Sequence, residues 1–206
     1  MNDVDHPLGE YKIHHANSLE LMKSTPEQSF DSVITDPPYA GFGFNPRNYM
    51  VGFKPYLIEM LRVTKRDMKH KRLAVSQPEG RVARLSRIIP GSYRLIRISD
   101  AFADSRGTAA TFYLRNPIEK TFRDLKLWSD LPDTTHSNSR DVNKLAGLIQ
   151  MMSQPGDTIF DPFCGSGSTG LAAVLMGRHF VGVELMEDRA EDARQRFVKI
   201  GAQETR

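Results

Sequence analysis

The sequence predicts an α/β fold, a seven-stranded, mostly parallel sheet with one antiparallel hairpin and with helices on both faces. Two observations predict it. Short apolar runs alternate with longer segments of helical periodicity along most of the 206 residues, which is typical of doubly wound parallel sheets. At one place two such runs follow each other with no helical segment between them, and this favours an antiparallel pair.

Seven runs are predicted to be strands because they are short and apolar, many of them rich in β-branched residues. They are residues 11–15, 31–35, 73–76, 93–98, 109–114, 158–160 and 180–184. Five helices are predicted from apolar periodicity, at residues 55–65, 80–89, 142–152, 168–176 and 187–200. The strands at 93–98 and 109–114 are expected to form the hairpin at one side of the sheet.

The composition predicts one compact domain over residues 1–206, because no repeat or Gly/Ser-rich linker divides the chain. No apolar run reaches about 18 residues, and the N-terminus lacks a signal-peptide pattern. We therefore expect a cytoplasmic protein with no membrane partner. The single cysteine, Cys164, excludes an internal disulfide, and the six histidines lack ligand spacing, so no metal ion is expected.

The charge distribution is more informative than the net charge of +3. Basic residues crowd positions 62–72 and recur at Arg81, Arg84, Arg87, Arg94 and Arg97. This asymmetry suits a polyanion such as nucleic acid. Surface helices also carry lysine and arginine for solubility, so charge alone leaves both interpretations open.

A glycine-rich turn lies between the strand at 158–160 and the helix at 168–176. Its glycines, Gly165 and Gly167, let the backbone turn sharply and bring N–H groups close to a ligand. The next strand ends in Glu184, whose carboxylate can accept hydrogen bonds from ribose hydroxyls. Asp161 precedes the turn; it would repel a pyrophosphate and suits a cationic ligand group. The pattern therefore favours S-adenosylmethionine over a dinucleotide.

A second motif, Asp36-Pro37-Pro38-Tyr39, follows the strand at 31–35 directly, at the edge where parallel sheets bind ligands. The prolines fix the backbone. The Asp36 carboxylate and the Pro37 carbonyl can accept both hydrogens of an exocyclic amine and favour a more nucleophilic nitrogen. Tyr39 offers a flat face to a base swung out of a duplex. Taken alone, the tetrapeptide is equally compatible with a rigid turn.

Together, Thr-Asp-Pro-Pro-Tyr at 35–39, Asp-Pro-Phe-Cys-Gly-Ser-Gly-Ser-Thr-Gly at 161–170 and Val-Gly-Val-Glu at 181–184 resemble the amino-methyltransferase family that modifies adenine N6 or cytosine N4 in DNA. The order, with the catalytic tetrapeptide first, resembles the permuted beta class. The resemblance covers nearly the whole chain. It implies a Rossmann-like class I methyltransferase fold with a catalytic half at residues 1–115 and a cofactor-binding half at residues 135–206.

The resemblance also implies roles at matching positions. The catalytic residues would be Asp36, Pro37, Pro38 and Tyr39. The residues that contact S-adenosylmethionine would be Asn17, Asp36, His136, Ser137, Asp161, Phe163, Cys164, Gly165, Ser166, Gly167 and Glu184. Cys164 is interpreted as a small buried side chain, because no partner base is apparent beside it and amine methylation needs no covalent enzyme intermediate.

Three departures from the family pattern bear on function. Ala16-Asn17 stands where relatives commonly have Gly-Asp, so an amide would replace the acidic contact to the cofactor's adenine amine. The stretch from His136 to Asp141 lacks the two prolines of the relatives. The chain also lacks a sizeable target-recognition region, and base readout needs side chains in a groove. We therefore expect a very short or degenerate DNA target, or a homodimer that supplies more surface.

The base and the substrate class leave alternatives. An Asp at position 36 favours adenine, because family members that modify cytosine more typically have Ser there. Cytosine N4 in DNA, adenine in RNA, and a catalytically silent nucleic-acid-binding module stay open as alternatives.

Overall fold

The computed structural model describes residues 7–38, 49–66, 72–75, 94–97, 111–114 and 142–205. Within these ranges the strands are β1 (Tyr11–His15), β2 (Ser32–Thr35), β3 (Arg72–Val75), β4 (Arg94–Arg97), β5 (Thr111–Leu114), β6 (Thr158–Asp161) and β7 (His179–Glu184). The helices are α1 (Ser18–Ser24), α2 (Tyr49–Val63), α4 (Val142–Met152), α5 (Ser168–Leu175) and α6 (Glu187–Lys199).

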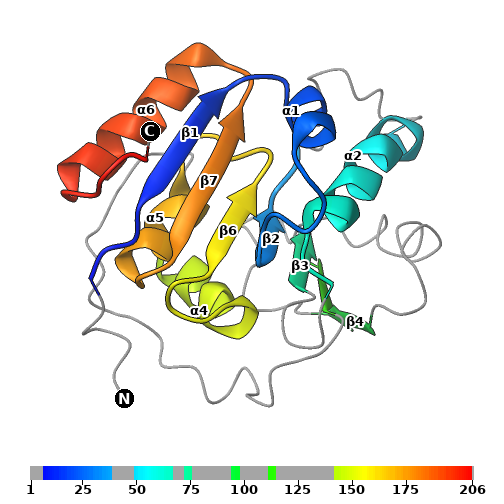
Figure 1. Ribbon diagram of the computed structural model, residues 1–206, viewed down its shortest axis with the longest axis horizontal. Helices are drawn as coiled ribbons and strands as arrows, with labels where there is room; N and C mark the ends of the chain where they lie inside the picture. The colour runs from blue at the N-terminus through cyan, green and yellow to red at the C-terminus, as the bar shows by residue number, and fades with distance from the viewer. Residues whose placement is uncertain are drawn as a thin grey trace.

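The strands form one sheet in the order β1-β7-β6-β2-β3-β5-β4 (Figure 1). The first five of these are parallel to one another. β5 runs antiparallel to both β3 and β4, and residues 98–110, which connect β4 to β5, lie outside the described residues. The predicted parallel α/β sheet is confirmed.

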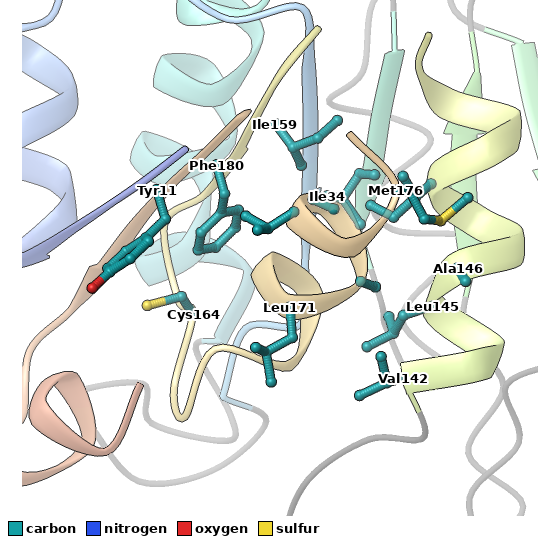
Figure 2. Close-up of a cluster of buried hydrophobic side chains, with 14 of the residues drawn as sticks. Tyr11, Ile34, Val142, Leu145, Ala146, Ile159, Cys164, Leu171, Met176 and Phe180 are labelled. Atoms are coloured by element: carbon teal, nitrogen blue, oxygen red, sulfur yellow. The ribbon is translucent and has the colours of Figure 1, made fainter. Parts of the chain in front are cut away.

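Alternating strand residues supply two separate cores, because successive side chains of a strand point to opposite faces. In β2, Ile34 packs in a cluster with residues of α4, α5 and α6, and its neighbour Val33 packs in a cluster with residues of α1 and α2. Figure 2 shows Ile34, Ile159 and Phe180 of the sheet meeting side chains of α4 and α5. Helices therefore cover both faces of the sheet.

Two helices differ from the sequence expectation. The helix expected at 55–65 begins at Tyr49 instead, so Pro55 lies inside α2 rather than at its start. The missing N–H of Pro55 leaves one turn without its usual hydrogen bond, but Val51, four residues earlier, is exposed, so water can reach this turn. Helix α1 is an addition that periodicity did not predict. The helix expected at 80–89 lies outside the described residues.

The topology places several chain segments at one edge of the sheet. Because β1, β7, β6 and β2 are parallel neighbours, their carboxyl ends meet there, as the arrowheads of β1, β7 and β6 show in Figure 1. Asn17, Glu184, Asp161 and Asp36 each end one of these strands or follow it closely. This edge is the usual ligand site of open α/β sheets. None of the helices in the described ranges has the length and apolar character needed to cross a membrane.

Candidate functional site

A cavity of about 520 Å³ opens at the carboxyl edge of the parallel strands, within the range of about 300–1,000 Å³ that is common for small-molecule sites. Both sequence motifs contribute to its lining. The lining residues are Ala16, Asn17, Ser18, Asp36, Pro38, Tyr56, Asp161, Pro162, Phe163, Cys164, Gly165, Ser166, Ser168, Thr169, Val183, Glu184, Leu185, Arg189 and Asp192. The end of β2 and the glycine turn after β6 thus face one common space.

Most residues predicted for the site lie at this cavity. Nine of them line it: Asn17, Asp36, Pro38, Asp161, Phe163, Cys164, Gly165, Ser166 and Glu184. Two others, Pro37 and Gly167, lie next to lining residues in the chain, and Gly167 is the N-cap of α5. The remaining three, Tyr39, His136 and Ser137, lie outside the described residues, so their predicted roles stay predictions.

The glycine turn owes its shape to two positive backbone φ angles. Gly165 has φ 53° and Gly167 has φ 81°, a conformation that residues with a Cβ rarely adopt. A Cβ at Gly165 would meet no atom within 4 Å, whereas one at Gly167 would lie 3.1 Å from Ala193 and Phe197 of α6. Gly165 therefore leaves open space beside the cavity, and Gly167 allows the close approach of α6.

Glu184 closes the turn from the neighbouring strand. Its Oε2 accepts a hydrogen bond from the Gly165 N–H at 2.9 Å, and its Oε1 accepts one from the Met186 N–H at 2.9 Å. Each carboxylate oxygen has a further acceptor position. The side chain is thus fixed in direction and can still receive ligand hydroxyls.

Asp161 is the most deeply buried carboxylate in the described part of the lining, with 2% of its surface exposed. Its Oδ1 accepts hydrogen bonds from the Thr35 hydroxyl at 2.6 Å and from the Phe163 N–H at 3.0 Å, and Thr169 also donates to the carboxylate. Burial raises the pKa of Asp161 from 3.8 to about 6, and the nearby negative charge of Asp36 adds to this effect. The three donors oppose it by stabilising the ionised form.

The thiol of Cys164 is buried, which confirms its interpretation as a small buried side chain. Burial raises its pKa well above the ordinary value, and the negative charges of Asp161 and Glu184 act in the same direction. A thiol with a raised pKa is a poor nucleophile at neutral pH. The arrangement gives no support to covalent catalysis at this position.

Asn17 serves the local fold as well as the cavity. It is the N-cap of α1, and its Oδ1 accepts hydrogen bonds from the backbone N–H groups of Leu19 at 2.9 Å and Glu20 at 3.4 Å. This pairing explains how a helix of seven residues begins directly after β1. The NH₂ group is then the part of the amide that can donate to a ligand in the cavity.

Sequence reasoning missed several residues that shape the site. Tyr56 of α2 lines the cavity, with its ring centroid 5.4 Å from that of Phe163. Arg196 of α6 donates to the Ser166 carbonyl at 2.6 Å and to the Ser168 hydroxyl at 3.2 Å, and these hydrogen bonds stabilise the glycine turn. The apolar periodicity of α2 could have indicated that Tyr56 faces the interior. No sequence signal ties Arg196 to a turn that is 30 residues away.

The lining is rich in negative charge. Among the residues that the structure describes, four carboxylates contribute to it, those of Asp36, Asp161, Glu184 and Asp192, against one guanidinium, that of Arg189. In a cavity that partly excludes water, this excess favours a cationic ligand over an anionic one. The charge of the described lining therefore favours a ligand that carries positive charge.

The sequence is similar to those of known methylases. A family model described as DNA methylase, N6_N4_Mtase, matches residues 96–195. YubD of Escherichia coli strain K12, which is described as a methylase, is 25% identical over 205 residues, spanning 88% of each chain.

Two solved structures share the fold. The M1.HpyAVI complex with SAM matches with a TM-score of 0.65 and 19% identity, over 91% of this chain and 98% of that chain. The PvuII DNA methyltransferase, described as cytosine-N4-specific, matches with a TM-score of 0.63 and 17% identity, over 93% of this chain and 88% of that chain. The fold is therefore that of the Rossmann-like methyltransferases. The match to the DNA methylase model spans 100 of the 206 residues, so the sequence is similar to that family over about half of its length.

Proposed function

We propose that this chain is a DNA methyltransferase that takes a methyl group from S-adenosylmethionine and places it on N6 of adenine. The observation that carries the proposal is the common cavity. Asp36 at the end of β2 and Gly165 in the turn after β6 line the same space, so a base held at Asp36 would lie beside a cofactor held at the turn.

The residues of the cavity fit S-adenosylmethionine. Gly165 lines the cavity and has open space where a Cβ would stand, and the excess of carboxylates in the described lining suits a ligand with ammonium and sulfonium charges. Asp161 would face the ammonium group, Glu184 the ribose hydroxyls, and the Asn17 amide the base. When bound, this cofactor supplies an electrophilic methyl group. The complex of M1.HpyAVI with SAM supports the same choice for a protein of this fold.

The substrate side of the site rests on Asp36 and Pro37. An exocyclic amine is a weak nucleophile because its lone pair is delocalised into the ring. Acceptance of its two hydrogens by the Asp36 carboxylate and the Pro37 carbonyl favours a more pyramidal, nucleophilic nitrogen. The nitrogen must also lose one proton, and Asp36, which lines the cavity, is placed to receive it. Tyr39 is proposed to stack on the flipped base.

Adenine is preferred to cytosine because position 36 is Asp, where cytosine members of the family more typically have Ser. The opposite assignment has one specific observation in its favour, the structural similarity to the cytosine-N4-specific PvuII enzyme. Both amines would use the same two acceptors, so the choice of base must be measured.

The test is transfer of a tritiated methyl group to single strands that contain either adenine and thymine only or cytosine and thymine only. We expect label on the adenine strand, and label on the cytosine strand alone would establish the alternative. An RNA strand of the first composition tests the substrate class. Asp36→Ala should lower turnover by roughly 10²–10³-fold with cofactor affinity unchanged, whereas Asp188→Ala, at an exposed carboxylate of α6, should change neither. Full turnover of the first variant would remove Asp36 from the mechanism.

We also propose that the chain is a short member of the permuted beta class, with its catalytic half at residues 1–115 and its cofactor half at residues 135–206. A short or degenerate target, or a homodimer, would compensate for the missing recognition region. Mapping of methylated bases in treated DNA tests the first, and light scattering with and without DNA tests the second. A target of six fully defined bases modified by a monomer would contradict both.

A further inference from the structure

A direct hydrogen bond joins the two motifs of the site. Thr35 is the last residue of β2 and immediately precedes Asp36, and its hydroxyl donates to Asp161 Oδ1 at 2.6 Å. Both residues are buried, with 4% and 2% of their surfaces exposed. A bond of this length to a carboxylate is in the range of the strong, charge-assisted class.

Thr35 differs in origin from the other donors to Asp161. The Phe163 N–H and the Thr169 hydroxyl come from the glycine turn and from the first turn of α5, both of which follow Asp161 in the chain. Thr35 comes from β2, which lies beside β6 with Val33 opposite Phe160. It is therefore the donor that fixes the cofactor side of the cavity relative to Asp36.

We propose that Thr35 is a positioning residue, whose hydroxyl holds the Asp161 carboxylate ionised and oriented for the cationic end of the cofactor and ties it to the strand that carries Asp36. This inference rests on the proposed function, because it takes the cationic ligand to be S-adenosylmethionine. The family resemblance assigns a role to Asp161 but none to Thr35.

The charges around Asp161 make such a donor necessary. Burial disfavours its ionised form, and the charge of Asp36 on β2 acts in the same direction. Glu184 at the end of β7 also lines the cavity, and the buried Cys164 thiol lies in the intervening turn. Arg189 of α6 lines the cavity too, but among the described residues the charge that acts on the pKa of Asp161 is the negative one of Asp36, and hydrogen-bond donors are what favour its ionisation. Loss of the Thr35 hydroxyl should raise the pKa of Asp161.

The test is the pH dependence of cofactor affinity. The dissociation constant of S-adenosylmethionine is measured by calorimetry between about pH 5.5 and 9 for the wild type, Thr35→Val and Thr35→Ser. A hydrogen bond to a charged group corresponds to about one pKa unit. The valine variant should therefore bind about five-fold more weakly than wild type near pH 6, and the ratio of the two constants should approach one above about pH 8. The serine variant, which keeps a hydroxyl, should follow the wild type.

A matched control removes a similar hydroxyl elsewhere. Thr64 is buried, and its hydroxyl donates to the Met60 carbonyl at 2.6 Å at the end of α2. Thr64→Val should leave the pH profile of binding unchanged. A second readout needs no cofactor: the pKa of Asp161, followed by carboxyl NMR titration, should rise in Thr35→Val or, should that variant not fold, in Thr35→Ala.

The outcomes separate the two proposals. No binding of S-adenosylmethionine by the wild type at any pH would overturn the proposed function. A second outcome is that the wild type binds the cofactor and the ratio of the Thr35→Val and wild-type dissociation constants is the same at every pH. This outcome would overturn only the inference about Thr35, because a space-filling role changes affinity equally at every pH. An unchanged carboxyl titration of Asp161 would overturn it as well.

Discussion

Replacement of Asp161 by Asn is expected to stabilise the cofactor-free protein. Burial raises the pKa of the carboxyl from 3.8 to about 6, so the folded state binds a proton that the unfolded state has already released. Between these two values the stability falls as the pH rises, and the full penalty is present above about pH 7. At about 1.4 kcal/mol per pKa unit, burial of the charge costs the folded protein roughly 3 kcal/mol.

Asparagine is neutral at every pH and nearly the same size as aspartate, and its Oδ1 can accept from the Thr35 hydroxyl and the Phe163 N–H in place of the carboxylate oxygen. The stability gain of Asp161→Asn should therefore be near its minimum at about pH 4 and approach an upper bound of roughly 3 kcal/mol above about pH 7. Cofactor affinity should fall at the same time, because the negative charge is gone. Gain of stability with loss of function is the expected pattern at a binding site.

The assay is urea unfolding of both proteins without cofactor, at several pH values from about 4 to 8. The difference between their unfolding free energies isolates residue 161, because every other group titrates in both proteins. A difference that does not change with pH, or one that shrinks as the pH rises, would refute the reasoning.

Two further predictions concern the backbone of the site. Gly165→Ala should lower the free energy of unfolding by about 1–2 kcal/mol because of the positive φ at this position, and it should also weaken cofactor binding. Gly156 has φ 84° and equally open surroundings, so Gly156→Ala should lose comparable stability and leave cofactor binding unchanged. Equal cofactor affinities of the two variants, measured by calorimetry, would contradict a binding role for Gly165. Asn17→Ala should lose about 1 kcal/mol through the missing cap of α1, whereas Asn17→Asp should keep it; urea unfolding in which both variants match the wild type would refute the capping role.

The sequence predicted those features that depend on local pattern. Alternation of strands and helices predicted the parallel sheet, and two motifs that each follow a strand were expected to lie at its ligand edge. The sequence did not predict which strands are neighbours in the sheet. β2 and β6 are neighbours although more than a hundred residues of chain separate their paired positions Val33 and Phe160, and no local pattern encodes that adjacency. Contacts that depend on it, above all Thr35 to Asp161, could not be predicted.

The two errors in the helices have different physical causes. The helix was expected to start at Pro55, a position that the preference of proline for the first turn of a helix would favour. Packing of Phe53 and Leu57 against the sheet instead holds the helix on both sides of this proline. Helix α1 has seven residues, too few for apolar periodicity to stand out, and its start depends on the Asn17 cap. Tertiary packing outweighs a weak local preference in α2, whereas a local cap sets the start of α1.

The position of Asp161 gives a physical reason to place function at this edge. A buried carboxylate that faces Asp36 and Glu184 lowers the stability of the fold, and a neutral residue could accept the same hydrogen bonds without that penalty. Such a group is expected where a ligand of opposite charge offsets the penalty on binding. The two core clusters are built from apolar residues, whereas Asp36, Asp161 and Glu184 lie where the parallel strands end. The charge that weakens the empty protein is therefore the charge that a cationic cofactor requires.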